Sequence, residues 1–597
     1  MTAPRPNPAH RSRPQLLAIT VAAIVVQRAP FRGSFSIMSN EGKDQRGSSF
    51  WSRIRHVLGG NDSPENSAEE SRAPRPKLEL IPKEYVGPKP ERTEKSEEPM
   101  LGIDFGSSYS SIGLLRGDSL ELVPLVGDDP MMPSVVSYPQ PDKVLVGEEA
   151  RQQLAGGAQH TISAPKRLLG RLYKDPATQR LLSGLAFETF AGSDRFLRFK
   201  AHGTIYSAQD ICAEIFAELR RRAATHFGQE LRNVVLAAPV GFGSLQRSAL
   251  EQAARQAGFH VHATLSEPTA AVMAQGFPED WQGHVGLYDF GGGTFDFTLL
   301  EVKKDSYHVL CAGGEPWLGG DDIDVSLAGD LASAFERQTK IDLRSRAVEW
   351  QRLLFAVERV KRELSVATSA EIAVEELIHT EAGVQGLEAE LTRQQFDALI
   401  DPLVQRSMVV VERVLAEAGI KPQSVDAVVM TGGTSLIPLV QRCVGEFFGN
   451  EPIVSRPHLA VVQGVCVEGA RLSGHGAANK VLRGRKVHDV IGRTIGAAAD
   501  DGPAITIFAR STPLPARCVQ RFTTTAHGKQ ELKISIFEQH TSRVDETKPL
   551  GTMMLRGLKG LPAGQEFVDV TFSMNEHGLL SVNATVGALQ ISETMHT

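Results

Sequence analysis

Two short turns rich in glycine and hydroxyl residues carry the strongest chemical signal in the sequence. One runs from Asp104 to Tyr109, and the other runs from Asp289 to Thr294, about 185 residues further along. Glycine, serine and threonine let backbone N–H groups come close to an anion, and an aspartate at the mouth of the turn can hold Mg²⁺ through its waters. One such turn is usually plain turn chemistry, but two matching turns predict a site for a magnesium polyphosphate.

A third glycine turn strengthens this prediction, and the lack of other motifs narrows it. The segment Thr431–Thr434 reads TGGT. The sequence has neither G-x-x-x-x-G-K-S/T nor a strand-linked G-x-G-x-x-G, which argues against P-loop and Rossmann sites. DFG triplets begin at Asp104 and Asp289, but no HRD catalytic loop accompanies them, which argues against a protein kinase.

The stretches around the first two turns predict two related α/β lobes. Each turn lies between two apolar, strand-like runs, so each reads as the tip of a β-hairpin. Two similar hairpins at this separation suggest lobes that face each other, and the helical patterns elsewhere favour α/β lobes. The runs are Leu101–Asp104, Ser111–Leu115, His284–Asp289 and Phe295–Val302, and the helical patterns are Ala208–Phe227, Leu245–Gly258, Ala347–Leu364, Arg393–Ala418 and Pro438–Phe448.

The character of the sequence changes after about Lys480. Long helical patterns stop, and short alternating runs follow, separated by turns rich in Gly, Pro and Asn. Strands at this spacing predict an all-β sandwich. The runs cover 505–509, 520–525, 531–538, 551–555, 566–574 and 578–585.

Composition bounds the class of protein. The chain has 597 residues, 41% of them hydrophobic and 22% charged, with a net charge of −6, which predicts two or three soluble domains. With no strongly basic face implied, nucleic acid is not expected as a partner. The five cysteines form no CxxC pair, which argues against a zinc site or a disulfide framework and fits a reducing compartment.

The first hundred residues predict a tail. The apolar run Leu16–Val26 is flanked by arginines and is too short to span a bilayer, which needs about 20 residues. Three readings stay open: the chain starts at Met38, the run is an unprocessed tail, or it serves export or anchoring. Residues 61–99 are rich in Pro, Glu, Lys and Ser, so we expect a disordered tether. Before it, Phe50–Leu58 could form a short amphipathic helix.

Six motifs follow one another in a fixed order from Met100 onwards. They are LGIDFGSSYS (Leu101–Ser110), APKRLLGR (Ala164–Arg171), SEPTAA (Ser266–Ala271), YDFGGGTFD (Tyr288–Asp296), WLGGDDID (Trp317–Asp324) and TGGTSLIP (Thr431–Pro438). In these motifs and their order, the chain from Met100 to its end resembles the 70-kilodalton heat-shock chaperones. The resemblance implies an α/β actin-like two-lobed ATPase domain followed by an all-β sandwich peptide-binding domain.

The resemblance also implies domain boundaries and ligands. We expect a disordered extension over 1–97, the nucleotide-binding domain over 98–478, a linker over 479–490 and the sandwich over 491–597. The helical lid that follows the sandwich in full-length family members is absent from this sequence. The expected cofactors are ATP or ADP with Mg²⁺, and K⁺ as an optional cation.

Individual roles follow from the matching motif positions. The resemblance implies that Asp104 and Asp289 hold hydrated Mg²⁺. It implies catalytic roles for Lys166, Glu267, Asp296 and Thr294 around the γ-phosphate and the attacking water, mainly by positioning and electrostatics. Pro239 and Arg247 match a pair that relays nucleotide state towards the linker. The predicted phosphate cradle consists of Gly106, Ser107, Ser108, Tyr109, Gly291, Gly292, Gly293, Thr294, Gly432, Gly433 and Thr434.

One helix face is expected to contact adenosine. Glu358, Lys361, Arg362 and Ser365 are spaced i, i+3, i+4, i+7, which places them on one face. Alone, this spacing is typical of a solvated, salt-bridged face. Because it matches the adenosine-binding helix of the family, we favour nucleotide contact.

The sequence departs from the family pattern in two places of the nucleotide domain and at the linker. Leu436 stands where the family has an arginine that stacks on adenine, and His458 replaces an aspartate. The linker segment Arg485–Asp489 is polar where the family has a run of leucines. A polar linker loses docking burial, about 0.8 kcal/mol per CH₂, so we expect weakened coupling between ATP and peptide.

The sandwich retains the apolar positions of the family's peptide cleft. These are Phe522, Leu532, Ile534 and Ile536. An apolar strand face is also the usual mark of a core, so this alternative stays open. Without a lid, peptide release should be fast and affinity modest.

The sequence therefore predicts an ATP-dependent chaperone that hydrolyses ATP and binds extended apolar segments of unfolded proteins. Expected partners are unfolded polypeptides, a J-domain co-chaperone and a nucleotide-exchange factor, with no membrane association and a cytoplasmic location. One alternative is a regulatory or scaffold protein that turns over little or no ATP. A more distant one is an actin-like sugar kinase, for which the sandwich has no use.

Overall fold

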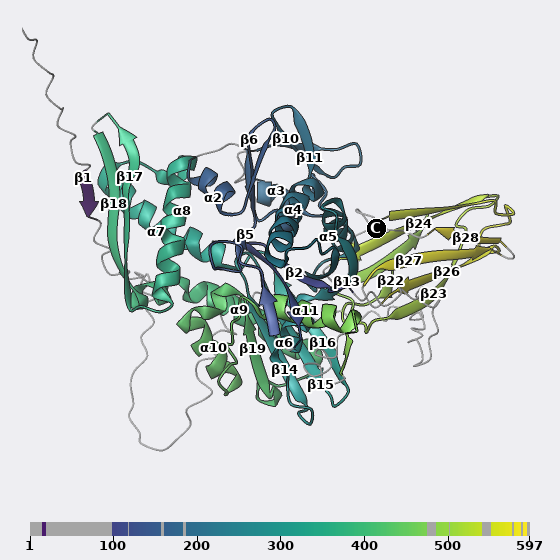
Figure 1. Cartoon of the computed structure of the whole chain (residues 1–597). Coiled ribbons are helices and arrows are strands. Elements are labelled where there is room, and N and C mark those ends of the chain that lie inside the picture. Colours follow the sequence, from purple (N-terminus) through teal and green to yellow (C-terminus); the bar gives the residue numbers. More distant parts are fainter. Residues whose placement is uncertain are drawn as a thin grey trace, which may run out of the picture. The chain divides into compact units, whose positions relative to one another are not determined.

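The computed structural model describes most of the chain beyond the first hundred residues (Figure 1). The predicted helix over Phe50–Leu58 and all but the last residues of the predicted tether lie outside the described residues. The described ranges are 15–18, 98–117, 119–156, 160–182, 187–381, 383–474, 485–500, 502–539, 551–575, 578–586 and 589–593.

Two sheets repeat one design, a β-hairpin paired with a parallel strand. In the first, the hairpin of β2 (Leu101–Phe105) and β3 (Tyr109–Arg116) lies beside β12 (Asn233–Ala238). Its strand order is β13-β12-β2-β3-β4, with β13 at His260–Ser266 and β4 at Ser119–Leu122, and β5 (Met132–Pro133) also pairs with β3. Every side chain of β12 is buried, as expected for a parallel strand covered on both faces.

The second sheet contains the second hairpin, formed by β14 (Gly283–Phe290) and β15 (Phe295–Val302). Its order is β19-β14-β15-β16-β20, with β19 at Ala427–Thr431, β16 at Ser306–Glu315 and β20 at Lys486–His488. The parallel partner of β14 is β19, which leads into the third glycine turn. Both hairpins predicted from the sequence are therefore present, each beside a parallel strand.

Helices cover these sheets, and local signals fix their ends. α4 (Ala208–Phe227) starts with a capping box, in which the Ser207 hydroxyl accepts from the Asp210 N–H at 3.1 Å, and it ends at Gly228 with φ 67°. The helices predicted at 208–227, 347–364, 393–418 and 438–448 have those bounds as α4, α8, α9 and α10, and the one predicted at 245–258 is α5 (Ser244–Gln256). Sequence analysis did not predict α2 (Glu148–Ala155), α3 (Pro176–Leu182), α6 (Glu267–Gln275), α7 (Gly320–Thr339) or α11 (Ala460–Leu472).

Three apolar clusters form the core of this α/β part. One lies around β2, α4 and α5, and another lies around β14, α7, α8 and α9. The third contains residues of α6 and α11 together with strands of both sheets, for example Val235 and Leu287. This shared cluster ties the two sheets to each other.

Three smaller sheets complete the α/β part. β17 (Ser369–Thr380) and β18 (Gly383–Thr392) form a hairpin, and β1 (Gln15–Ala18) pairs in parallel with β18. A strand therefore interrupts the extension expected to be disordered, because an apolar segment can satisfy its backbone at an open sheet edge. The other two sheets are β7-β6-β8 and β11-β10-β9, with bounds Lys143–Val146, Val135–Gln140 and Thr161–Ser163, and Thr204–Ser207, Leu197–Ala201 and Glu188–Ala191.

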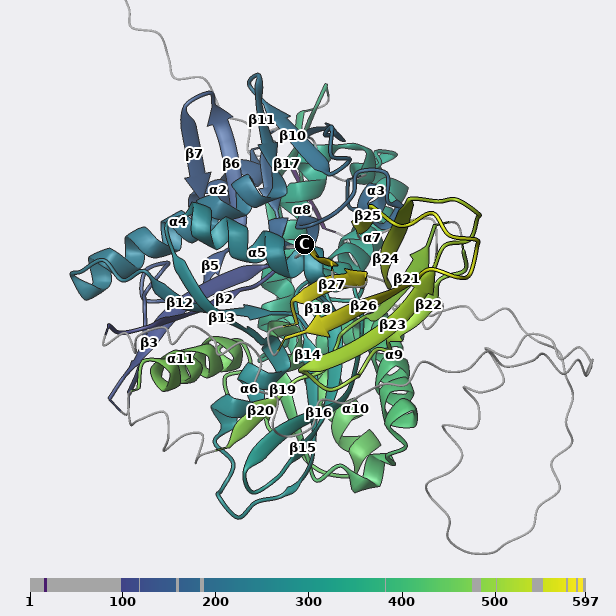
Figure 2. The same cartoon turned by 90° about the vertical axis from the view of Figure 1, so that its right-hand side faces the viewer.

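The C-terminal strands form two four-stranded sheets around one apolar core. Figure 2 shows β23, β26 and β27 side by side in one of them. The two sheets share a cluster that includes Ile534 and Val570, which is the packing expected of a sandwich. One sheet is β22-β21-β24-β25 (Ile505–Phe508, Thr494–Ala499, Glu531–Gln539, Gly551–Arg556), and the other is β23-β26-β27-β28 (Ala516–Thr523, Phe567–Met574, Leu580–Val586, Leu589–Glu593).

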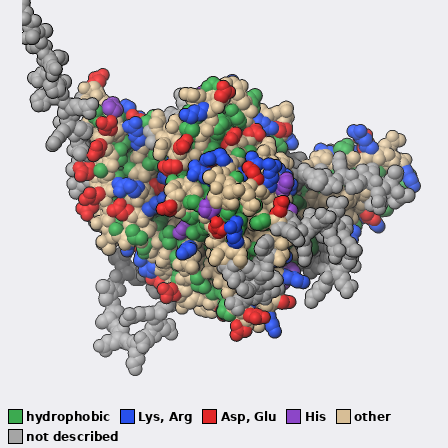
Figure 3. All heavy atoms as spheres, in the orientation of Figure 1, with side chains coloured by type: hydrophobic (Ala, Val, Ile, Leu, Met, Phe, Trp, Pro, Cys, Tyr) green, Lys and Arg blue, Asp and Glu red, His purple; other side chains and the backbone are tan. Residues whose placement is uncertain are grey.

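The surface shows no segregation of charge on the face drawn in Figure 3, where acidic, basic and apolar side chains are mixed. Among the described residues, no helix combines the length and the apolar character needed to cross a bilayer.

Candidate functional site

A cavity of about 1260 Å³ collects most of the residues singled out from the sequence. Both hairpin turns line it, together with the third glycine turn, the 3-10 turn Pro165–Leu168 (η1) and one face of α8. All of the predicted catalytic, metal and nucleotide residues lie in its wall. Of the predicted switch pair, Pro239 lines the cavity, whereas Arg247 is buried and is not among the lining residues.

The centre of the cavity is a buried lysine among carboxylates. Lys166 is 4% exposed, and its Nζ lies 2.5 Å from Glu267 Oε1. Glu267 starts α6 directly after β13, and Lys166 belongs to η1, so the pair joins two distant segments. The carboxylate holds the buried lysine side chain in place.

Three aspartates next to this pair resist ionisation. Burial, with the nearby Glu267 charge second, raises the pKa of Asp104 to about 7 and that of Asp296 to about 7. The same two causes raise the pKa of Asp289 to about 8. Lys166 offsets only part of these effects. More carboxyl groups are gathered here than the protein itself keeps ionised, so a cation that stabilises their charged form suits the site.

Magnesium fits this donor set through water. In the part of the chain that the structure describes, no group of three or more His, Cys, Asp or Glu side chains lies close enough together to hold a metal directly. Mg²⁺ usually keeps several of its waters and takes one or two carboxylates. Asp104 and Asp289, at the ends of β2 and β14, would therefore hold the ion through its hydration shell.

The two hairpin turns approach each other where phosphates would lie. A Cβ placed on Gly292 would come within 1.9 Å of Ser108 Oγ, so the turns meet only because this residue is glycine. The Ser108 hydroxyl is buried and has no hydrogen-bond partner. A buried, unsatisfied donor costs about 1–3 kcal/mol, and a phosphate oxygen in the cradle would relieve it.

The third glycine turn packs against the second. Thr434 Oγ1 donates to the Gly291 carbonyl at 2.8 Å. Gly432 has φ 79°, and a Cβ on it would lie 2.3 Å from the Phe290 carbonyl oxygen. Only glycine allows this approach, so the turn is positioned by strand β14 as well as by β19.

The predicted face of α8 contacts two parts of the cavity wall, α7 and the first hairpin turn. Lys361 Nζ donates to Asp324 Oδ2 at 2.6 Å and to the Gly320 carbonyl at 3.0 Å, both on α7. Glu358 accepts from the Tyr109 hydroxyl at 3.2 Å, and Arg362 donates to Glu358 at 2.5 Å. The face is thus both salt-bridged and part of the cavity wall, and Ser365 lines the wall next to it.

Sequence analysis missed two arginines that tie the cavity together. Arg151, on α2, is paired with Glu358 and donates to the Tyr109 hydroxyl at 3.1 Å. Arg167 donates to the carbonyls of Gly293 and Pro316 at 2.7 and 2.8 Å. Arg167 lies inside the APKRLLGR motif and could have been found there, whereas nothing in the sequence around Arg151 marks it.

The two departures from the family pattern within the expected nucleotide-binding domain also lie in the cavity wall. Leu436 is 39% exposed and lines the wall, so an apolar surface stands where the sequence comparison expects a stacking arginine. His458 lines it too, and burial lowers its pKa.

The predicted switch pair is in contact at the edge of the sandwich. Arg247, 7% exposed, donates to the Pro239 carbonyl at 3.4 Å and to the Phe242 carbonyl at 3.3 Å. Nearby, the Ser244 N–H donates to Glu538 of β24 at 3.0 Å, and Arg493 lies 3.8 Å from the same carboxylate. The start of α5 therefore contacts the sandwich directly.

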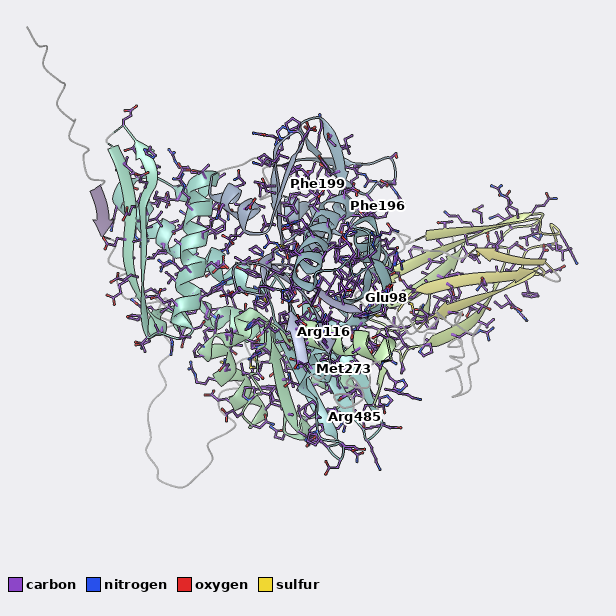
Figure 4. The ribbon with its side chains drawn as sticks, in the orientation of Figure 1. Glu98, Arg116, Phe196, Phe199, Met273 and Arg485 are labelled. Carbon is purple, nitrogen blue, oxygen red and sulfur yellow. The ribbon has the colours of Figure 1, made fainter. Side chains whose placement is uncertain are left out.

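The polar linker segment docks on the second sheet through its backbone and through Arg485, and the expected weakening of ATP–peptide coupling stays a prediction. Lys486–His488 forms β20, which extends the second sheet by pairing in parallel with Ser306–His308 of β16. Arg485, labelled in Figure 4, is 3% exposed and donates to five carbonyl oxygens at 2.6–3.1 Å. Its guanidinium also lies 5.5 Å from the centre of the Tyr307 ring. Hydrogen bonds replace the apolar burial that leucines would supply.

The four predicted peptide-contacting side chains lie in the sandwich core. Phe522 is 8% exposed, and Leu532, Ile534 and Ile536 are fully buried. In this conformation the four residues are therefore part of the core, which is the alternative that the sequence left open. In this conformation, none of the four offers an exposed surface to a peptide.

Comparison with known proteins agrees with the six motifs. The family model described as Hsp70 protein matches residues 100–596. A relative named "Mitochondrial-type heat shock protein 70", from Encephalitozoon cuniculi (strain GB-M1), is 30% identical over 493 residues, which cover 82% of each chain.

The expectation of a cytoplasmic location is contradicted by the same comparison. The relative is by its name a mitochondrial-type protein, and this finding overturns the expectation. Sequence analysis took the scattered, unpaired cysteines as a sign of a reducing compartment, and this pattern does not distinguish one such compartment from another.

Proposed function

Because the chain belongs to the Hsp70 family, and is therefore related to chaperones with an actin-like ATPase domain and a β-sandwich, we propose that it is an ATP-dependent molecular chaperone. It would bind and hydrolyse ATP in the cavity between the two hairpin turns and use the nucleotide state to control peptide binding. The observation that carries the proposal is the cluster of Lys166, Glu267 and three aspartates with raised pKa values beside a glycine cradle.

The roles of the residues follow from their charges and positions. The backbone amides of the two turns and the Ser108 hydroxyl would bind the phosphates, while Lys166 would hold the γ-phosphate. Glu267 and Asp296 would orient the water that attacks the γ-phosphorus. The bond between the γ-phosphorus and the oxygen that bridges it to the β-phosphate then breaks, and ADP and inorganic phosphate are released. Mg²⁺, when bound through Asp104 and Asp289, would neutralise developing charge on the phosphate oxygens.

A single-turnover ATPase assay tests the proposal. Lys166→Ala should lower the rate of phosphate release at least about 100-fold, as expected when one preorganised charge is removed from a transition state. Lys200→Ala is the matched control, because it breaks an exposed ion pair with Glu188, 3.4 Å long. Equal rates in the wild type and Lys166→Ala would reject hydrolysis at this site.

Peptide binding is the second half of the proposed function. The buried positions Leu532 and Ile534 mean that a peptide must compete with the closed core, so we expect a Kd in the micromolar range or weaker. Fluorescence anisotropy with a labelled extended apolar peptide measures it. No binding with ATP, with ADP or without nucleotide would remove the chaperone assignment and leave an ATPase alone.

One observation favours a second candidate, a regulatory or scaffold protein with weak ATP turnover. Leu436 provides no planar cation for the base, and a stacked cation contributes about 1–2 kcal/mol. Slow, Lys166-independent turnover together with nucleotide-dependent binding of a partner would support this candidate. A J-domain co-chaperone or a nucleotide-exchange factor that raises turnover would support the chaperone.

A further inference from the structure

Two histidine rings stack where the linker joins the second sheet. His488 of β20 and His308 of β16 are register partners in the parallel pair. Their ring centres lie 4.6 Å apart, and the ring planes are within 9° of parallel. Both side chains are half-buried. Sequence analysis noted this segment only as polar, and the proposed function uses neither ring.

The rings share one small surface with several charged groups. Glu301 of β15 is the register partner of His308 on its other side. Ser306 Oγ lies 2.8 Å from His308 Nε2. The remaining charged groups around the pair are Lys303 and Asp305 in the turn before β16, and Lys486 and Asp489 next to His488 in the chain.

These surroundings favour the neutral form of the His308 ring. Burial lowers the pKa of His308, and the neighbouring His488 and Lys303 lower it further, while Glu301 and Asp305 offset part of the effect. The two carboxylates can balance one added proton. A second proton would place two like charges on stacked rings in a half-buried site, which is unfavourable.

We propose that the His308–His488 stack makes linker docking sensitive to pH, so that the linker pairs with β16 when both rings are neutral and is released on acidification. The sign follows from linkage. A released linker carries His488 into solvent, where a histidine has the ordinary pKa of about 6.5, and it also leaves the His308 ring without its stacked neighbour. Release therefore takes up protons and becomes more favourable as the pH falls below that value. Arg485, whose guanidinium donates to five carbonyl oxygens, anchors the segment at neutral pH.

Hydrogen exchange of the backbone amides of residues 486–488 in the full chain tests the proposal. After correction for intrinsic rates, protection of the wild type should fall as the pH is lowered from about 7.5 to about 5.5, through the ordinary pKa of histidine. Amides of β14 should keep their protection over this range. Protection at 486–488 that does not change with pH would overturn the proposal.

Two variants separate the stack from general acid effects. His488→Phe keeps an aromatic ring and cannot be protonated, so its linker protection should be independent of pH. His308→Phe should behave in the same way, and it serves if the first variant does not dock at neutral pH. His379→Phe, at an exposed position of β17, is the matched control and should keep the wild-type response. An equal loss of protection on acidification in all three variants would overturn the proposal. The readout requires neither ATP turnover nor peptide binding, so its outcome is independent of the proposed function.

Discussion

The nucleotide cavity and the linker junction both bury charge, but they neutralise it differently. In the cavity, Asp104, Asp289 and Asp296 face one lysine that already pairs with Glu267. At the junction, the guanidinium of Arg485 is surrounded by five carbonyl oxygens of the protein. Buried charge that the chain itself satisfies stabilises structure, whereas buried charge left over indicates a ligand.

Removing one of the surplus carboxyl groups from the cavity tests this comparison most strongly. Asp289→Asn should lower Mg²⁺-dependent phosphate release about 100-fold or more. It should not lower the melting temperature of the ligand-free protein, because burial already disfavours the charged form of this carboxyl. Asp142→Asn, at an exposed turn, is the control. A melting temperature that falls while turnover stays unchanged would make Asp289 a structural residue.

At the linker junction, by contrast, a substitution should weaken the docked structure. Arg485→Ala leaves several carbonyl oxygens without a donor, each costing about 1–3 kcal/mol if it stays buried. Amide protection at 486–488 should fall more than about tenfold, since even one such loss corresponds to roughly that factor. Lys486→Ala, at the exposed neighbouring position, should leave protection unchanged. If Arg485→Leu restores docking, apolar burial rather than hydrogen bonding holds the linker.

A smaller effect is expected at residue 436, where a substitution tests which part of the cavity wall contacts the base. Leu436→Arg supplies the planar cation that this wall lacks and should tighten ATP binding by about tenfold, the equivalent of 1–2 kcal/mol. Leu436→Met keeps an apolar side chain and should bind ATP as the wild type does. Calorimetric titration with ATP measures both variants. Equal affinity in all three proteins would show that the base does not lie against residue 436.

The smallest effect is expected in the sandwich, where a charge is paired as it is at the junction. Asp500 accepts from Lys529 Nζ at 2.9 Å and from the Lys533 N–H at 3.2 Å. Burial raises its pKa, but these hydrogen bonds outweigh burial and leave the pKa below its ordinary value.

The pH dependence of Asp500 follows from that direction. A depressed pKa contributes stability that is present above the unfolded value of about 3.9 and is lost as the pH falls through the folded value. Asp500→Asn should therefore lower the unfolding free energy by about 1 kcal/mol at neutral pH and have no effect near pH 2. Denaturant titration at both pH values checks this. An equal loss at both would point to packing instead of charge.

More of the candidate site than of the linker junction could be predicted from the sequence. The turns at Asp104 and Asp289 are local signals, because a strand, a glycine turn and a returning strand are adjacent in the chain. Lys166 and Glu267 needed the family motifs, since they come from separate segments that meet only in the fold. Arg151 had no signal at all.

The sequence did not reveal which groups hold the polar linker. The segment around Arg485 was expected to lose docking burial because it lacks leucines. The carbonyl acceptors that bind its guanidinium come from residues 277–281 and Lys303, which are about 200 residues away in sequence and lie near it only in three dimensions. The sandwich positions Leu532, Ile534 and Ile536 show the reverse ambiguity, because alternation predicts a buried face without saying whether a ligand or the core covers it.

The central claim is that the surplus carboxylates and the glycine cradle bind magnesium triphosphate. Isothermal titration calorimetry of the full chain with ATP in the presence of Mg²⁺ tests this most directly. The account predicts saturable binding of one nucleotide per chain, which weakens when Mg²⁺ is chelated and is lost in Gly292→Val, where a side chain would separate the two turns. No heat of binding at millimolar ATP with Mg²⁺ present, or equal binding by Gly292→Val, would contradict it.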